Sequence, residues 1–168
     1  MAAERYAFEP LGSQDRAAFS CGNDELDRYL KQRAGQDRRR YIATCFLLVD
    51  KDGSAVVGYY TLSACVVVAT GLPEALAKKF PRYPDLPGIL IGRFAVDLRY
   101  QGQGFGRMLL TDALARARET AEHRVGSAFV IVDAKNEEAK GFYEQFGFTP
   151  FESSPMRLFL PTAEIPGS

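Results

Sequence analysis

The segment RYQGQGFGRMLL, residues 99–110, holds three glycines in five positions directly before a run of leucines. Gly102, Gly104 and Gly106 carry no side chain that would keep a ligand away from the backbone N–H groups. A helix that begins at such a loop adds the positive end of its dipole, which attracts phosphate groups. No Ser, Thr or Asp stands at the expected cap position to accept those N–H groups. The segment therefore predicts either a phosphate-binding loop or a plain strand-to-helix turn.

Two common phosphate-binding loops do not match the spacing of these glycines. A Walker A loop requires Lys and then Ser or Thr after its last glycine, where this chain has Arg107 and Met108. A dinucleotide fingerprint requires G-x-G-x-x-G, one residue longer than the spacing found here. No acidic residue ends a following strand at the distance that this fingerprint expects. The spacing therefore argues against ATP and NAD as ligands.

The bulk composition bounds the class of protein. Lys plus Arg and Asp plus Glu both number 21, so no net charge draws the whole chain to a polyanion. Cys21, Cys45 and Cys65 are odd in number and form no C-x-x-C pair, which argues against a disulfide framework and a zinc site and fits a reducing cytoplasm. Neither a signal peptide nor a membrane-spanning run of roughly 18 apolar residues is found. We expect a cytoplasmic protein of one domain, residues 1–168 with a core over about 5–161, and neither a metal nor a membrane partner.

Hydrophobic periodicity and turn residues predict the elements that must position the loop. Four helices are expected: residues 21–34, 72–80, about Phe105 to His123, and 136–147. Asn23 is the expected N-cap of the first and Asn136 that of the last. In the first helix, one face carries Leu26, Tyr29, Leu30 and Arg33. Strands are expected over 41–50, 54–69, 89–98 (covered on both faces), 127–134 and 156–162, and residues 81–88 are expected to form a proline-rich loop. Because strands and helices alternate around the glycine loop, the order predicts an α/β fold of the α+β kind with a mixed sheet.

Two motifs together resemble the GNAT N-acetyltransferases. Gln101-Gly102-Gln103-Gly104-Phe105-Gly106 matches Q/R-x-x-G-x-G/A directly after the strand GRFAVDLRY, and the helix NEEAKGFYEQFGF begins about 30 residues later. The resemblance covers most of the chain and implies the GNAT-like acyl-CoA N-acyltransferase fold, with splayed central strands and acetyl-CoA as co-substrate. It also implies the cofactor contacts. The pantetheine arm would follow the backbone of Phe94, Ala95 and Val96, the pyrophosphate would bind the N–H groups of residues 101–106, and Asn136 would be a further contact.

Tyr143 is the residue that the resemblance indicates as the general acid. Phe142 and Phe146, four residues apart, are the expected core pair, which turns Tyr143 about 100° away and leaves its hydroxyl for a cleft. A phenol with a pKa near 10 suits the protonation of a departing thiolate, since thiols have pKa values around 8.5. Backbone N–H groups around Val96 would polarise the thioester carbonyl, as in the family. No general base is evident, because His123, the single histidine, is expected to be a surface residue.

The N-terminal third narrows the choice of acceptor amine. The segment FSCGNDELDRYLKQRAGQDRRRYIATCFLLVD, together with GYYTLSA and GRFAVD, resembles the toxin branch of the GNAT enzymes. That branch acetylates the amino group of aminoacyl-tRNA and so blocks translation, and a small ribbon-helix-helix antitoxin neutralises it. Residues 31–40 carry five basic side chains against one acidic one, a local charge of +4 that is suited to phosphates. The expected tRNA contacts are Lys31, Arg33, Arg38, Arg39, Arg40 and, beside the cofactor strand, Arg93.

Other interpretations of the same residues remain open at this point. The acceptor can instead be an amine of a protein or a small molecule, and the basic cluster is also compatible with a solvated face. A third class is a non-enzymatic partner that binds acyl-CoA or DNA. An α-amine, with a pKa of about 7.7 to 8.0, is partly neutral near pH 7, whereas a lysine at about 10.4 needs a base. The lack of an evident base thus favours the α-amine, and we also expect a homodimer.

Overall fold

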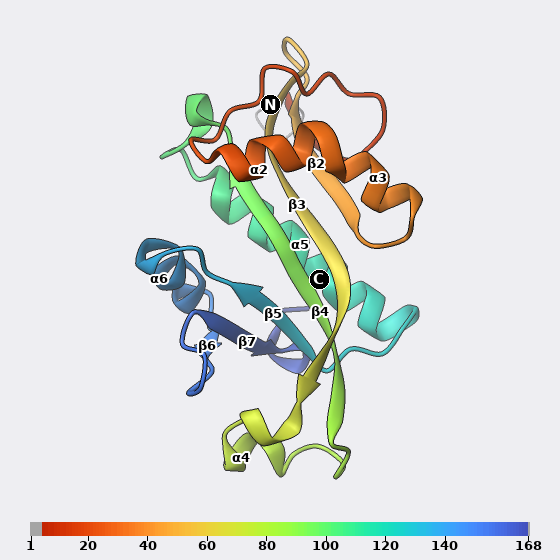
Figure 1. The fold of residues 1–168 in the computed structure, drawn as a ribbon, viewed down its shortest axis with the longest axis vertical. Helices are drawn as coiled ribbons and strands as arrows, with labels where there is room; N and C mark the ends of the chain where they lie inside the picture. The colour runs from red at the N-terminus through yellow and green to blue at the C-terminus, as the bar shows by residue number, and fades with distance from the viewer. Residues whose placement is uncertain (1–4, 168) are drawn as a thin grey trace. The chain divides into compact units, whose positions relative to one another are not determined.

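The computed structural model describes residues 5–167 (Figure 1). Its strands are β1 (Tyr6–Pro10), β2 (Thr44–Asp50), β3 (Ala55–Val68), β4 (Asp85–Val96), β5 (Phe129–Asp133), β6 (Thr149–Pro150) and β7 (Arg157–Pro161). Its α-helices are α2 (Asp24–Arg28), α3 (Ala34–Arg39), α4 (Glu74–Ala77), α5 (Phe105–His123) and α6 (Glu137–Gln145), and a π-helix over Tyr29–Arg33 joins α2 to α3. In the described residues the strands form one sheet in the order β1-β2-β3-β4-β5-β7-β6.

The sheet is mixed, as the sequence predicts. β4 pairs with β5 in parallel, whereas β1–β2, β2–β3, β5–β7 and β6–β7 are antiparallel. The register between β4 and β5 runs only from Gly88 to Ile91, so in the described part of the chain this ladder stops before Phe94–Val96. The backbone of these three residues therefore lies beyond the parallel ladder.

The chain divides into two compact units, each with its own apolar core. The first comprises Met1–Ser63 and Gly92–Ala113. Leu30, Leu47 and Tyr59 are fully buried at its centre, where α2, the π-helix and α3 pack against β2 and β3. The backbones of β3 and β4 also come close together, because a Cβ on Gly58 would lie 2.7 Å from the carbonyl oxygen of Ala95.

The second unit comprises Ala64–Ile91 and Leu114–Ser168. Its core is made of Val67, Leu72, Leu86, Phe129, Ile131 and Phe159. Gly88 allows a close approach here, because a Cβ would lie 2.9 Å from Sγ of Cys65. Helix α6 has the caps that the sequence predicts, since Oδ1 of Asn136 accepts from the N–H of Ala139 at 2.8 Å and Gly147 follows the helix with a φ of 96°.

The prediction of one continuous helix over residues 21–34 is wrong. Asn23 is its N-cap, as predicted, and accepts from the N–H of Leu26 at 3.1 Å. The five-residue π-helix then widens the turn and rotates the side chains that follow it. As a result Ala34 is buried, whereas Arg33, predicted on the apolar face, is exposed.

The strand predictions need three corrections. β4 begins at Asp85, inside the segment predicted as a proline-rich loop. Pro87 can belong to this strand although it has no N–H, because its carbonyl accepts a hydrogen bond from the N–H of Ala128. Arg93 and Gly92 on β4 are exposed, so the strand is not covered on both faces along its whole length. The short strands β1 and β6 were not predicted, since neither carries an apolar run long enough to stand out.

Candidate functional site

The glycine loop has the conformation that an anion site at a helix N-terminus requires. After a 3₁₀ turn over Leu98–Tyr100, Gly102 and Gly104 adopt φ angles of 77° and 89°, and a Cβ at either would meet nothing within 4 Å. The carbonyl of Gly104 accepts from the N–H of Met108 at 3.3 Å, which makes Gly104 the N-cap of α5. A glycine cap has no side chain to accept the first N–H groups of the helix, which therefore face the space outside its end. These residues fit a pyrophosphate.

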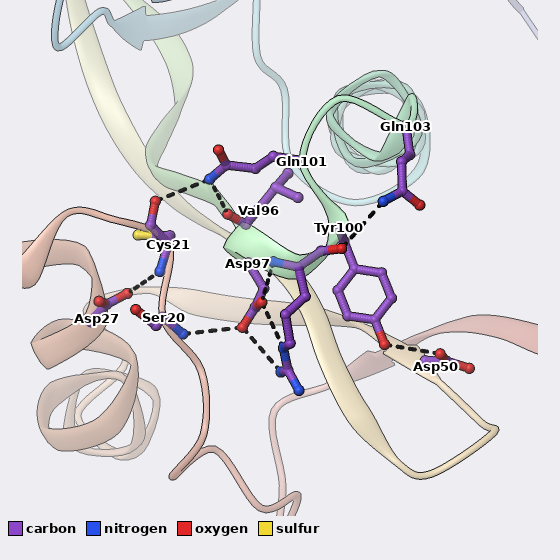
Figure 2. A network of polar contacts seen from close by, with 10 residues as sticks. Ser20, Cys21, Asp27, Asp50, Val96, Asp97, Tyr100, Gln101 and Gln103 are labelled. Carbon is purple, nitrogen blue, oxygen red and sulfur yellow. Dashed lines mark hydrogen bonds and ion pairs between the residues drawn. The ribbon is translucent and has the colours of Figure 1, made fainter.

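The two glutamines of the loop hold its backbone in place (Figure 2). Nε2 of Gln101 donates to the carbonyl of Val96 at 2.8 Å and to that of Cys21 at 3.0 Å. Nε2 of Gln103 donates to the carbonyl of Arg99 at 3.2 Å. Both residues were predicted to contact the cofactor through their backbone N–H groups, and the structure shows that their side-chain amides bond to the end of β4, to the 3₁₀ turn and to the segment before α2.

Asp97, which was not predicted as a site residue, links the end of β4 to the segment before α2 (Figure 2). Its carboxylate is 1% exposed and accepts from the N–H of Ser20 at 3.1 Å, from the N–H of Arg99 at 2.9 Å and from the Arg99 guanidinium at 2.9 and 3.1 Å. Burial by itself raises the pKa of Asp97, but the bonds from Arg99 and Ser20 outweigh it and lower the pKa below its usual range. The Asp97 carboxylate thus connects the end of β4 with the chain that leads into α2.

A second buried carboxylate, also missed, supports the loop from β2. Asp50 is 1% exposed and accepts two bonds of 2.9 Å from the Arg5 guanidinium and one of 3.0 Å from the hydroxyl of Tyr100. The bond from Arg5 is the main reason that the pKa of Asp50 falls to about 2, against the effect of its burial. Tyr100 also packs edge-on against Phe105, with ring centroids 5.6 Å apart. One sequence signal was available for both carboxylates, because Asp50 and Asp97 each directly follow an apolar strand run.

Two predicted cofactor residues, Ala95 on β4 and Phe105 on α5, have buried side chains. Ala95 is 4% exposed and Phe105 7%, and the Phe105 ring also lies edge-on to Tyr6 at 4.8 Å. Val96 is half-buried, and its carbonyl is already bonded to Gln101. Gly106 lies in the first turn of α5. A cofactor that runs along this segment would therefore meet main-chain groups rather than side chains.

The five basic residues predicted between residues 31 and 40 form a cluster in the chain, and all of them are exposed. Lys31, Arg33, Arg38, Arg39 and Arg40 are all exposed, and within residues 5–167 none of them forms an ion pair with an acidic side chain. Arg93 reaches this cluster from β4, because its guanidinium lies 4.0 Å from the centre of the Tyr29 ring. The Tyr29 hydroxyl in turn donates to Oδ2 of Asp37 at 2.8 Å. Arg93 on β4 is thus linked through Tyr29 to Asp37 of the helical segment, and its contact with tRNA stays a prediction.

Tyr143 lies in the second unit, and its surroundings differ from the prediction. Its side chain is 6% exposed, whereas Phe142 and Phe146, predicted as the core pair, are only half-buried. The Tyr143 ring packs on Phe148 at 5.7 Å, because Phe148 is folded back onto α6 by the turn at Gly147. Burial, followed by the charge of Asp133, raises the pKa of Tyr143 and keeps its phenol protonated. The side chain of Asn136 serves as the α6 cap, and its contact with the cofactor stays a prediction.

In the described residues no group of three or more His, Cys, Asp or Glu side chains is arranged to hold a metal ion. His123 is 67% exposed at the end of α5, which confirms it as a surface residue. No helix within residues 5–167 has the length and apolar character to cross a membrane.

Fold and loop together define a class of protein: a mixed-sheet α/β protein whose strand–glycine loop–helix unit fits the phosphates of a carrier molecule. The acetyltransferase (GNAT) family model matches residues 12–148, and the chain belongs to this family. It is therefore an acetyltransferase that uses acetyl-CoA as co-substrate, and the residues of the loop described above fit that molecule.

The chain is similar to two curated proteins over most of its length. One is the "Probable toxin TacT" of Sinorhizobium fredii, 32% identical over 97% of this chain and 94% of that protein. The other is the "tRNA-acetylating toxin" of Mycobacterium tuberculosis, 34% identical over 88% of this chain and 86% of that protein.

Two solved structures have the same fold. AtaT complexed with acetyl-methionyl-tRNAfMet has a TM-score of 0.88 and 31% identity, over 95% of this chain and 96% of that one. A mutant AtaT toxin bound to the C-terminus of the antitoxin AtaR and to acetyl-CoA has a TM-score of 0.81 and 27% identity, over 96% of both chains.

Proposed function

We propose that this protein is a toxin that transfers an acetyl group from acetyl-CoA to the α-amino group of aminoacyl-tRNA and so blocks translation. The observation that carries the proposal is the exposed cationic cluster of residues 31–40, connected through Tyr29 to Arg93 on the cofactor strand. A protein without net charge needs such a local cluster to bind RNA. The printed names of its relatives, a tRNA-acetylating toxin and a toxin bound to acetyl-methionyl-tRNA, support the same substrate.

The chemistry that acetyl-CoA supplies when bound is an activated acetyl thioester. The N–H groups at the start of α5 and of the glycine loop would bind its pyrophosphate, with Phe94, Ala95 and Val96 beside the pantetheine arm. The backbone N–H near Val96 would stabilise the oxyanion that forms when the amine attacks directly. Tyr143 would then donate its proton to the departing thiolate, and the proton that the attacking nitrogen loses as the amide forms would restore the phenol. Its buried phenol is a weaker acid than free tyrosine and holds this proton throughout the physiological pH range.

The α-amino group is the acceptor that best matches the side chains present. The attacking nitrogen must be unprotonated, and an α-amine with a pKa of about 7.7 to 8.0 is partly so near pH 7. A lysine acceptor, at about 10.4, would require a positioned base. The single histidine, His123, is exposed on the last turn of α5 and outside the cationic cluster and the glycine loop.

The partners of this activity follow from the same proposal. The relative bound to the antitoxin AtaR supports a small antitoxin as partner, which we propose to be of the ribbon-helix-helix type. An enzyme that acts on aminoacyl-tRNA would work in the cytoplasm, and we propose that it does so as a homodimer of single-domain chains. Size-exclusion chromatography with light scattering would test the dimer, and a monomeric mass at micromolar concentration would contradict it.

A labelling experiment decides the acceptor. Purified protein is offered a mixed pool of charged tRNAs with labelled acetyl-CoA, and the aminoacyl species that gain label are identified. Label on one or more aminoacyl-tRNAs is the expected result. Label only on added polyamines or on protein would instead identify an enzyme for those amines. If no acceptor gains label although acetyl-CoA raises the melting temperature, the chain is a non-enzymatic acyl-CoA-binding protein.

A further inference from the structure

Tyr41 occupies a backbone position that normally belongs to glycine. It follows α3 and Arg40, the C-cap, and has a φ of 61°. The N–H of Tyr41 donates to the carbonyl of Arg38 at 3.2 Å, and the N–H of Ile42 donates to that of Asp37 at 2.9 Å. This pair of bonds is the Schellman motif, in which the residue after the C-cap adopts the left-handed conformation. A Cβ disfavours that conformation, and a large aromatic residue is therefore unusual there.

Nothing within the described chain compensates for this strain by burying the ring. The Tyr41 side chain is 96% exposed, and its neighbour Ile42 is 61% exposed. Tyr29, by contrast, packs in the core of the first unit. The fold therefore holds an aromatic ring out in solvent at a point where glycine would serve the backbone better.

The charges around Tyr41 indicate the kind of partner that the ring would meet. Arg38, Arg39 and Arg40 directly precede it, and all three are exposed. The one carboxylate of this segment, Asp37, already accepts the hydroxyl of Tyr29. An exposed ring among unpaired cations is the composition of sites that bind unpaired nucleotides, where the ring stacks on a base and the cations contact the flanking phosphates.

The backbone next to Tyr41, though not its ring, is linked to the cofactor strand by direct contacts within the first unit. Arg93 of β4 lies over Tyr29, the Tyr29 hydroxyl bonds to the Asp37 side chain, and the Asp37 carbonyl accepts the N–H of Ile42. Each contact fixes the next, so the position of the Tyr41 corner is determined relative to Arg93. An RNA that reached Arg93 could follow the same cationic segment to Tyr41.

We infer that Tyr41 is a stacking platform for an unpaired nucleobase of an RNA whose neighbouring phosphates are bound by Arg38, Arg39 and Arg40. The inference rests on the proposed function, because it specifies how the RNA part of the acceptor is held. It assigns the ring a binding role that is separate from the acetyl transfer itself.

The test uses an RNA hairpin with an unpaired 3′ overhang that carries 2-aminopurine, and the same hairpin with blunt ends. The wild-type protein should bind the overhang RNA more tightly and quench the fluorophore by stacking on it. Tyr41→Gly should abolish the quenching and weaken binding by roughly 5- to 150-fold, the range for one stacked base. The melting temperature of the same variant should stay equal or rise, because glycine relieves the positive φ. Tyr41→Phe should preserve both binding and quenching.

Tyr83→Ser is the matched control, since Tyr83 is also exposed, at 62%, and follows Pro81 and Arg82 in the second unit. It should change neither signal. Equal binding and quenching by Tyr41→Gly and the wild type would overturn the inference. The inference would also be overturned if Tyr41→Gly lost the binding of a protein partner, such as an antitoxin or a second copy of the chain, while its RNA binding was unchanged. The assay contains no acetyl-CoA and no amino acid. Tyr41-dependent quenching without acetylation of any aminoacyl-tRNA would therefore leave the platform intact and reject the proposed function alone.

Discussion

Two buried carboxylates at the ends of strands hold the cofactor loop of this acetyltransferase in place. Asp97 joins the end of β4 to the chain before α2, and Asp50 joins the end of β2 to Tyr100 just before the glycines. Each accepts at least one charge-assisted bond from an arginine, Arg99 or Arg5. Charges buried in this way remain ionised only while those partners are in place. Both residues are positioning residues, and their effects should differ from those of the reacting groups.

Asp50 makes the stability of the protein depend on pH in the acid range. Its pKa of about 2 lies below the ordinary value of 3.8, so its bonds stabilise the fold fully above about pH 4 and are lost as the pH falls towards 2. We expect the free energy of unfolding of the wild type to exceed that of Asp50→Asn by an amount that is constant above pH 5 and shrinks below pH 4. Urea denaturation at several pH values measures it. Asp52→Asn, at an exposed neighbour, is the control, and a difference that does not change with pH would contradict the assignment.

Tyr143→Phe removes the proposed proton donor while keeping a ring that packs on Phe148. We expect kcat to fall by about 10²- to 10⁴-fold, the usual contribution of a positioned acid, with little change in the KM for acetyl-CoA. Single-turnover acetylation gives the rate, and circular dichroism verifies the fold. Tyr83→Phe, at an exposed tyrosine, should behave as the wild type. A Tyr143→Phe enzyme as fast as the wild type would remove Tyr143 from the mechanism.

At the scale of elements, the decisive unit is β4, the glycine loop and α5. The strand ends at Val96, the loop turns through two positive φ angles, and α5 begins with a cap that has no side chain. The glycines are therefore needed for their backbone conformation, because a Cβ at Gly102 or Gly104 would meet no neighbouring atom. Buried apolar residues on one face of α5 (Leu109, Leu110, Ala113, Leu114 and Ala117) keep the start of the helix fixed behind the loop.

Gly104→Ala separates the strain of the loop from its function. A Cβ at a φ of 89° should lower the free energy of unfolding by about 1–2 kcal/mol. It should also raise the KM for acetyl-CoA about tenfold or more, because the altered loop would lose one charge-assisted hydrogen bond to a phosphate. Gly53→Ala is a closely matched control, because Gly53 has a φ of 92° and equally open surroundings but lies in the turn between β2 and β3. It should cost the same stability with no change in KM, and an equal KM for both variants would contradict the phosphate site.

At the scale of the whole molecule, the distribution of charge matters more than its total. Acidic and basic residues balance over the chain, yet residues 31–40 present five exposed cations and one carboxylate that is engaged with Tyr29. A local cluster of this kind binds phosphates without drawing the rest of the surface to nucleic acid. The affinity for RNA should therefore depend on this segment almost alone.

Replacing Arg38, Arg39 and Arg40 together by alanine should weaken tRNA binding and flatten its salt dependence. Each lost phosphate contact lowers the slope of log K against log[salt] by about 0.7–0.9. The KM for acetyl-CoA should not change. Filter binding at several salt concentrations gives the slope. Arg124→Ala, at an exposed arginine of the turn after α5 that pairs with Glu119, should leave the slope unchanged, and a triple variant with the wild-type slope would rule out the cluster as the RNA site.

The sequence was sufficient for features that depend on neighbours in the chain. The mixed sheet, the long helix from Phe105 to His123, the caps at Asn23 and Asn136 and the glycine loop all follow from periodicity and local backbone chemistry. The spacing of the glycines argued against ATP and NAD loops, and the resemblance of the loop and the α6 motif to the GNAT family implied the acetyl donor. These features need no knowledge of distant contacts.

Only the tertiary structure decided how distant residues meet. The Arg93–Tyr29 stack, the bond between Asp97 and Ser20, and the burial of Tyr143 ahead of Phe142 depend on packing between segments that lie far apart in the chain or beyond a sharp turn. The π-helix that exposes Arg33 likewise goes with the burial of Leu30 and Ala34 in one core. Local sequence propensity cannot predict these contacts, because burial is a property of the assembled fold rather than of a short stretch of sequence.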